Sequence, residues 1–357
     1  MRIVIAKKTL STVGGSEMFA RSLDRELRAL GHDVTLVGLK PAWSRPGIAA
    51  DRRSVFLSVR GGRIGAAIDG LLPTSLVDER DLRRTISSAD VVHSIAREWV
   101  APLERAARAE GSAFVETPLV HPGQPFSGNT DGDIARYRRD DAVIALTEWE
   151  AGWYRERGVQ NVHVTGIAPN LLTLPPVARE AATILFVGRK ERYKGYHALR
   201  DAARIVWGER PDAKFIAIGQ AAWTARFSRP RTDPRWEELG VVSEEGKALA
   251  YARASIFAMP SDHETFGHTY LEAWRAGLPV IAGDIAPLRE IVREGVDGLH
   301  VRNEPQAIAD AILALLRDPN RAAAMGQSGR ARVDSEFTWP VVARKTEAAY
   351  RSSIERA

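Results

Sequence analysis

The sequence predicts an α/β protein made of two Rossmann-like domains, and three observations indicate this class. Its length of 357 residues suggests two domains of about 150 residues each. Short apolar runs alternate with amphipathic helical patterns in both halves of the chain. A segment containing Pro175-Pro176 separates the halves. We therefore expect domains at 1–174 and 175–337, followed by a C-terminal helix at 338–357 that caps the second domain or crosses back onto the first.

The first half opens with the order of elements that builds a parallel sheet. An apolar run at 3–6 is followed by a glycine-containing loop and then by a helical pattern that ends at Gly31. A second apolar run at 34–37 completes the strand–turn–helix–strand unit. The sequence predicts a parallel sheet in this half.

The second half repeats this plan without repeating the sequence. It starts with a buried strand at 184–187, a turn at 188–195, a helix at 196–207 and a strand at 215–218. Further units combine a strand at 256–259, a helix at 269–276 and a strand at 279–282, so the second half predicts a second parallel sheet.

Composition excludes several classes of protein. The hydrophobic share of 45% and charged share of 27% are ordinary globular values, which argue against disorder, collagen and coiled coils. The absence of cysteine excludes a disulfide framework, a thiolate metal site and a cysteine nucleophile. A net charge of +5 over this length does not by itself indicate a nucleic-acid partner.

The chain shows no targeting or membrane segment. The apolar run at its start is too short for a signal peptide, and no stretch approaches the ~20 apolar residues that span a bilayer. We expect a soluble, cytoplasmic protein.

The most informative stretch is 261–273, where a strand ends and a polar loop enters a helix. Ligands of open α/β sheets bind at the carboxyl ends of strands, where helix N-termini offer free N–H groups. Thr265, Phe266 and Gly267 would present such donors, and Glu264 and Glu272 could line one cleft from different depths. The alternative is that Glu264 caps the helix and Glu272 is solvated.

A second stretch, 186–195, places two cations beside a strand end. Arg189 directly follows the strand and Lys194 precedes the next helix. Such a pair can neutralise a diphosphate leaving group, a task otherwise performed by a metal ion. The alternative is a basic surface turn.

Two positions in the first half are further candidates. Gly15, in a paired-glycine turn before a helix, would let the backbone approach a phosphate or a sugar closely. His121, in a Pro-rich loop after a strand, could hydrogen-bond a substrate hydroxyl near neutral pH. Glycine turns are common in α/β proteins, and a lone histidine is often structural. Asp131-Gly132-Asp133 looks like an acidic metal-binding pair, but acidic residues also suit a helix N-terminus.

In this order and spacing, these stretches resemble the retaining GT-B glycosyltransferases of family four. The resemblance covers nearly the whole chain and is strongest over 184–301. Three features carry the resemblance: the segment Glu264 to Gly267, a second glutamate at Glu272, and the segment Ala276 to Ala282. Seven residues separate Glu264 from Glu272, as in the family signature. His268 departs from the family, which usually has an aliphatic residue there, and Trp274-Arg275 replace small residues.

The resemblance implies roles for individual residues. Glu264 would bind hydroxyls of the donor sugar, Glu272 the ribose hydroxyls, and Arg189 and Lys194 the diphosphate. Gly15 would approach the sugar diphosphate from the other domain, and His121 would contact the sugar near the reacting carbon. Further contacts to the diphosphate would come from backbone N–H groups around Phe266, Gly267, Thr269 and Tyr270.

The resemblance also implies an activity. A hexose would pass from a nucleoside diphosphate sugar to an acceptor hydroxyl with retention of anomeric configuration. A UDP-sugar is expected as donor rather than a GDP-sugar. The departing phosphate oxygen would help to take the acceptor proton, and no metal or further cofactor would be required. Domain closure would exclude water.

Alternatives remain at this point. A nucleotide-sugar epimerase would consume the donor without an acceptor, and a phosphorylase would need a pyridoxal-binding lysine, for which no motif is present. A non-catalytic nucleotide-binding module is a third reading, although degenerate sites usually lose charges that are costly to desolvate. We expect a small molecule or a glycan as acceptor. The basic segment 41–84 could contact an anionic membrane, but a solvated face is favoured.

Overall fold

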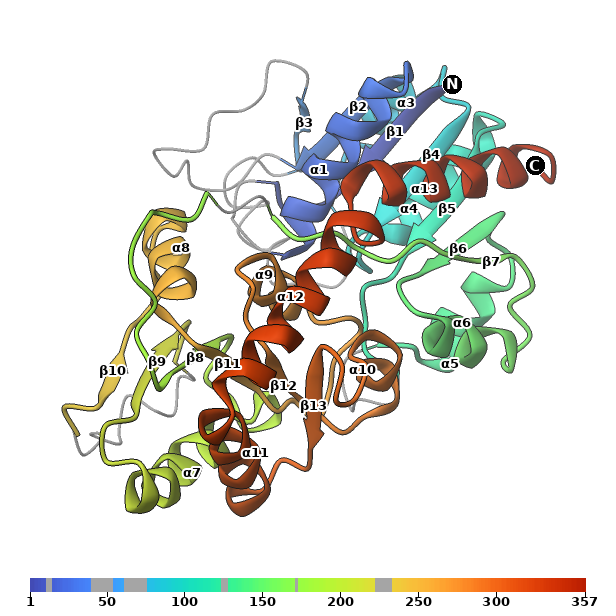
Figure 1. Ribbon diagram of the computed structural model, residues 1–357. Helices are drawn as coiled ribbons and strands as arrows, with labels where there is room; N and C mark the ends of the chain where they lie inside the picture. The colour runs from blue at the N-terminus through green and yellow to red at the C-terminus, as the bar shows by residue number, and fades with distance from the viewer. Residues whose placement is uncertain (11–14, 40–53, 61–75, 123–127, 171–172, 222–232) are drawn as a thin grey trace. The chain divides into compact units, whose positions relative to one another are not determined.

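The computed structural model describes residues 1–10, 15–39, 54–60, 76–122, 128–170, 173–221 and 233–357. Within them the chain divides into two compact units (Figure 1). Unit 1 contains Met1–Ile167 and Trp339–Ala357, and unit 2 contains Ala168–Thr338.

The division lies slightly before the boundary expected after residue 174. Ala168 and the residues that follow it belong to unit 2. One physical reason is a hydrogen bond of 3.1 Å from the backbone N–H of Asn170 to Nε2 of His268, which joins this segment to unit 2.

Unit 1 contains a parallel sheet with the strand order β3-β2-β1-β4-β5-β6-β7. The order reverses direction between β1 and β4, as in Rossmann-like folds. The strands are β1 (Arg2–Ala6), β2 (Asp33–Leu39), β3 (Ser54–Leu57), β4 (Val91–Ile95), β5 (Ala113–Thr117), β6 (Ala142–Ala145) and β7 (Val162–Val164). The helices are α1 (Gly15–Ala29), α3 (Glu79–Ile86), α4 (Val100–Ala109), α5 (Asp131–Tyr137), α6 (Glu148–Arg155) and α13 (Trp339–Ile354).

The C-terminal helix α13 completes unit 1. In Figure 1 it lies beside α1, although the two helices are at opposite ends of the chain. Trp339 packs edge-on against Phe19 of α1 with ring centroids 5.6 Å apart. The Tyr350 hydroxyl forms a hydrogen bond of 2.7 Å with Nδ1 of the buried His93 on β4. The other ring nitrogen of His93, Nε2, forms a hydrogen bond of 2.7 Å with the Thr117 hydroxyl. His93 therefore has a structural role that anchors α13 on the sheet.

Unit 2 contains a second parallel sheet, with the order β10-β9-β8-β11-β12-β13. Its direction reverses between β8 and β11. The strands are β8 (Thr183–Val187), β9 (Lys214–Ile218), β10 (Trp236–Glu238), β11 (Ile256–Met259), β12 (Val280–Gly283) and β13 (Gly298–Val301). The helices are η1 (Arg192–Lys194), α7 (Tyr196–Glu209), α8 (Glu244–Arg253), α9 (His268–Arg275), α10 (Ala286–Ile291), α11 (Pro305–Arg317) and α12 (Pro319–Ser335).

The central strands are continuous apolar runs because helices cover both faces of a parallel sheet. All five residues of β8 and all four of β11 are buried. Asp297, in the turn before β13, is fully buried and accepts from Arg293 and Arg332 at 2.6 and 3.1 Å, so it has a structural role.

Among the described residues, no helix combines the length and apolar character needed to cross a bilayer.

Candidate functional site

The candidate site of unit 2 lies at the carboxyl ends of two neighbouring strands. β8 and β11 pair in parallel, so the loops that follow them leave the same edge of the sheet. This is also the point at which the strand order reverses, where ligands of open α/β sheets bind. The backbone N–H of Asp262 donates to the carbonyl of Tyr193 at 2.7 Å and so joins the two loops.

Lys194 and Glu264, one from each loop, form an ion pair at this edge. Their side chains are only 12% and 7% exposed. The Ser261 hydroxyl donates to the same Glu264 oxygen at 3.3 Å. Because the pair is largely withdrawn from solvent, its charges are weakly screened and act strongly on a polar group placed beside them.

Arg189 is the exposed cation of the same edge. Its side chain is 59% exposed, its guanidinium carbon lies 5.3 Å from the centroid of the Tyr193 ring, and it donates to the Tyr193 hydroxyl. An ion pair with Glu191 at 3.7 Å is solvent-exposed and therefore weak. The guanidinium is thus available to an anion.

The N-terminus of α9 has no side-chain cap. Gly267 precedes the helix with φ +88°, and a Cβ there would lie 2.3 Å from the Tyr270 ring, so only glycine fits. The N–H of Tyr270 donates to the Gly267 carbonyl at 3.0 Å, but among the described residues no side chain caps the helix, so the N–H groups of His268 and Thr269 can bind an anion.

Glu272 occupies a second, separate position on α9. Lys247 of α8 donates to its Oε1 and Tyr251 to its Oε2, both at 3.0 Å. Burial alone lowers the pKa of Lys247, but Glu272 and Glu244 outweigh it and the pKa is raised. Burial, with Glu272, raises the pKa of Tyr251. The carboxylate of Glu272 is therefore held in one orientation.

Sequence reasoning missed Lys247 and Tyr251. Their signal was weak because α8 reads as an ordinary surface helix, with Ser243 at its N-cap. Only the contact between α8 and α9 shows that both side chains address Glu272.

The other unit 2 candidates contribute through their backbone or are packed away. Phe266 is buried against Phe337, with ring centroids 5.7 Å apart. Tyr270 is fully buried and donates to the Met259 carbonyl. Thr265 and Thr269 are partly exposed. The structure thus brings Arg189, Lys194, Glu264, Gly267 and the N-terminus of α9 to one edge of the unit 2 sheet.

Gly15 and His121 belong to unit 1. Gly15 is exposed at the start of α1, and a Cβ there would have no neighbour within 4 Å. His121 is half-buried, four residues after β5. Most of the segment 41–84 lies outside the described residues.

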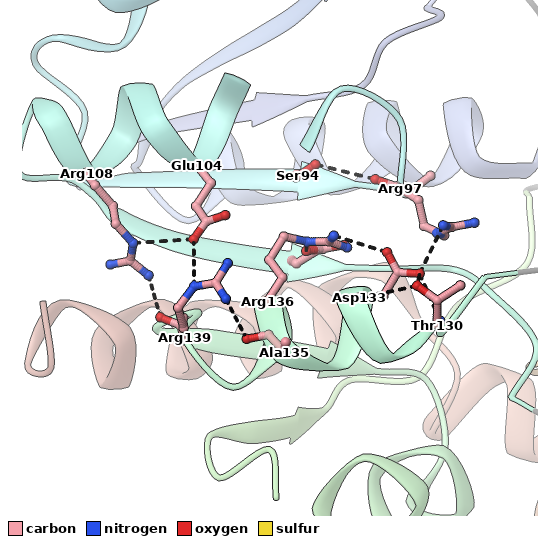
Figure 2. A network of polar contacts seen from close by, with 11 residues as sticks. Ser94, Arg97, Glu104, Arg108, Thr130, Asp133, Ala135, Arg136 and Arg139 are labelled. Atoms are coloured by element: carbon pink, nitrogen blue, oxygen red, sulfur yellow. Dashed lines mark hydrogen bonds and ion pairs between the residues drawn. The ribbon is translucent and has the colours of Figure 1, made fainter. Parts of the chain in front are cut away.

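A network of ion pairs surrounds the start of α5 in unit 1 (Figure 2). Arg97 donates to Asp133 at 3.0 Å, and Arg136 donates to Asp133 at 3.1 Å. Arg136 also forks onto both oxygens of the buried Glu116 at 3.0 and 3.2 Å. Thr130 and Asp133 form a capping box. Burial raises the pKa of Asp133, but the bonds from Thr130 and the two arginines outweigh it and lower the pKa. The segment 131–133 therefore caps the N-terminus of its helix.

Among the described residues, no group of three or more His, Asp or Glu side chains is placed to hold a metal ion.

Two family models match the chain. The model described as "Glycosyl transferase 4-like domain" matches residues 14–170, and "Glycosyl transferases group 1" matches residues 176–332. Together they cover nearly all of both units.

Curated relatives are similar over part of their length. A D-inositol 3-phosphate glycosyltransferase of Corynebacterium urealyticum is 34% identical over 68% of this chain and 60% of its own length. A GDP-mannose-dependent monoacylated alpha-(1-6)-phosphatidylinositol monomannoside mannosyltransferase of Corynebacterium glutamicum is 33% identical over 42% of each chain. The chain thus spans about half the length of the curated relatives it matches.

Solved structures share the fold over the whole chain. Sucrose-phosphate synthase from Thermosynechococcus elongatus has a TM-score of 0.79 at 19% identity, with full coverage of both chains. Anabaena HepE, in complex with UDP and glucose, has a TM-score of 0.77 at 17% identity and covers 99% of this chain and 100% of its own. The fold is GT-B, as the sequence predicts. The chain belongs to the group 1 glycosyl transferases, the family that the sequence resembles.

Proposed function

We propose that the chain is a retaining glycosyltransferase that moves a hexose from a nucleoside diphosphate sugar to an acceptor hydroxyl. As donor we favour a UDP-sugar over a GDP-sugar. The observation that carries this proposal is the Lys194–Glu264 ion pair beside the uncapped N-terminus of α9. It offers a cation and free N–H groups for a diphosphate, and a carboxylate for sugar hydroxyls, at one edge of a sheet.

The charges account for the chemistry. As the sugar–oxygen bond to the diphosphate breaks, negative charge develops on the leaving phosphate, and Arg189, Lys194 and the N–H groups of α9 stabilise it. The anomeric carbon forms its new bond to the acceptor oxygen on the same face, and the leaving phosphate oxygen takes the acceptor proton. With these cations, the proposed reaction requires no divalent metal.

The remaining residues position the donor. Glu272, fixed by Lys247 and Tyr251, would accept the two ribose hydroxyls. Gly15 and His121 would contact the donor from unit 1, His121 near the reacting carbon. The acceptor would be a small molecule or a glycan. Because one curated relative is a D-inositol 3-phosphate glycosyltransferase, phosphorylated polyols belong among the acceptors tested.

The test is a screen of UDP- and GDP-hexoses with the purified chain, scored by release of the nucleoside diphosphate. Release that increases with an acceptor, an α-configured product from an α-configured donor, and full activity in EDTA are the expected results. Isomerisation of the donor without acceptor indicates an epimerase instead. Nucleotide binding without any turnover indicates a non-catalytic module.

A further inference from the structure

His268 connects two parts of unit 2 that are far apart in the sequence. It is the first residue of α9, and its Nε2 accepts the backbone N–H of Asn170 at 3.1 Å. A ring nitrogen that accepts a hydrogen bond carries no proton, so the imidazole is neutral and its proton is on Nδ1.

The position of this bond relates it to the candidate site. Unit 2 begins at Ala168, so Asn170 lies in the segment by which the chain enters the unit. His268 lies in the same helical turn as Thr269 and Tyr270, at the end of α9 that has no side-chain cap. A single side chain therefore ties the entering segment to the turn proposed to bind diphosphate.

The charged groups around His268 come from α9 and α8. Burial lowers the pKa of His268, Glu272 and Glu244 act to raise it, and Lys247 acts to lower it. The net pKa is below the ordinary histidine value, which keeps the ring neutral at pH 7.5. A proton added to Nε2 at lower pH would remove the acceptor for Asn170.

We propose that His268 is a positioning residue for nucleoside diphosphate binding: its neutral imidazole holds Asn170 against the first turn of α9, and protonation releases Asn170. The choice of diphosphate as the ligand rests on the proposed function, whereas the bond to Asn170 does not.

Two variants separate the hydrogen bond from the bulk of the side chain. In His268→Gln the amide oxygen can take the place of Nε2 and cannot titrate, whereas His268→Leu has no acceptor. His197→Leu on α7 is the matched control, because His197 is a partly buried histidine of the same unit outside the candidate site. Thermal melts establish that each variant is folded.

Amide hydrogen exchange at Asn170 reads out the bond without any ligand. At pH 7.5 we expect exchange to be about tenfold faster in His268→Leu than in the wild type, and unchanged in His268→Gln and His197→Leu. In a series of decreasing pH, with all proteins compared at the same pH, wild-type exchange should approach that of His268→Leu once the ring is protonated, while His268→Gln stays protected. Equal exchange in all variants would overturn the inference.

Calorimetric titration with UDP at pH 7.5 reads out the consequence. We expect His268→Leu to bind UDP roughly 3–10-fold more weakly and His268→Gln to stay within about twofold of the wild type. Faster exchange with unchanged affinity would show that the bond exists but does not position the site, and would overturn the role assigned to it. A wild type that binds neither UDP nor GDP would refute the diphosphate role and the proposed function together, while the exchange data would still decide whether His268 holds Asn170.

Discussion

The N-termini of α5 in unit 1 and α9 in unit 2 differ in how their free N–H groups are satisfied. At α5, Thr130 and Asp133 close a capping box, and Asp133 supplies a carboxylate from within the chain. At α9, Gly267 leaves the N–H groups without a side-chain partner. A helix whose own carboxylate sits at its N-terminus has little attraction left for an external anion, whereas an uncapped one retains it.

The charged side chains of the two regions differ in the same way. In unit 1, Arg97 and Arg136 pair with Asp133 and Glu116 in a continuous network whose two carboxylates are buried. In unit 2, the Arg189 side chain is 59% exposed. Lys194 pairs with Glu264, which lies in the other of the two loops at this sheet edge. Similar residue types thus hold the fold together in one place and are available to a ligand in the other.

The largest effect should come from breaking the unit 1 network. Arg136→Met leaves the buried carboxylates of Glu116 and Asp133 without their shared cation, and should lower the free energy of unfolding by ~3–5 kcal/mol. Urea unfolding measures it. Arg84→Met, at an exposed ion pair of the same unit, should change stability by less than about 0.5 kcal/mol. Equal effects of the two substitutions would contradict the buried role.

Lys194→Ala should show the opposite behaviour, with a large loss of activity and a smaller loss of stability. Removing a preorganised cation from a developing phosphate charge should reduce kcat/KM by ~10²–10³-fold. Donor turnover measures this, with Glu272→Ala as a second site variant. Lys214→Ala, an exposed lysine of unit 2, is the control and should keep full turnover. Full activity of both site variants would show that the site is assigned wrongly.

The architecture of both units could be predicted because it depends on local patterns. The runs at 3–6, 34–37, 184–187 and 215–218 all lie in buried parallel strands. The short strands β7 and β10 carry no comparable apolar run and went unpredicted.

Pairings between distant residues could not be predicted. Nothing near Glu272 in the sequence indicates Lys247, 25 positions away, because the pair depends on how α8 packs beside α9. The partners of His93 depend likewise on α13, which lies 257 positions away at Tyr350. Motif spacing located the chemistry-bearing residues, but only tertiary structure shows which of them share a proton or a charge.

Tyr350→Phe tests the structural role of one such pairing. It removes the partner of Nδ1 in the fully buried His93 and should lower the free energy of unfolding by ~1–3 kcal/mol. Tyr137→Phe is the matched control, because among the described residues the buried Tyr137 hydroxyl has no hydrogen-bond partner. Chemical denaturation should show the control unchanged or slightly more stable. A larger loss in the control would contradict the assignment.

His93 also gives unit 1 a dependence on acid. Burial lowers its pKa to about 3, so the folded state excludes a proton that the unfolded state binds below about pH 6.5. The stability of unit 1 should therefore decrease as pH falls through this window.

The smallest effect concerns Asp140, a buried carboxyl group on which Glu116 and Arg136 of the unit 1 network act electrostatically. Arg97 and Arg136 balance Asp133 and Glu116, so an ionised Asp140 would add an uncompensated charge. Burial, together with Glu116 and Glu104, raises the pKa of Asp140 well above its ordinary value. The folded state then keeps a proton that the unfolded state releases above its ordinary pKa of about 4.

Stability should consequently decrease as pH rises above about 4, until Asp140 ionises in the folded state as well, by at most ~1.4 kcal/mol per pH unit from this group. Asp140→Asn is neutral in both states, so it should lose this slope and exceed the wild type in stability at pH 8, where Asp201→Asn at an exposed position should not. Urea unfolding at several pH values measures the slopes. Parallel pH profiles of the wild type and Asp140→Asn would mean that Asp140 is ionised in the folded protein. The unit 1 network would then hold a net charge. That result would remove the contrast between a closed, balanced network in unit 1 and an open one in unit 2.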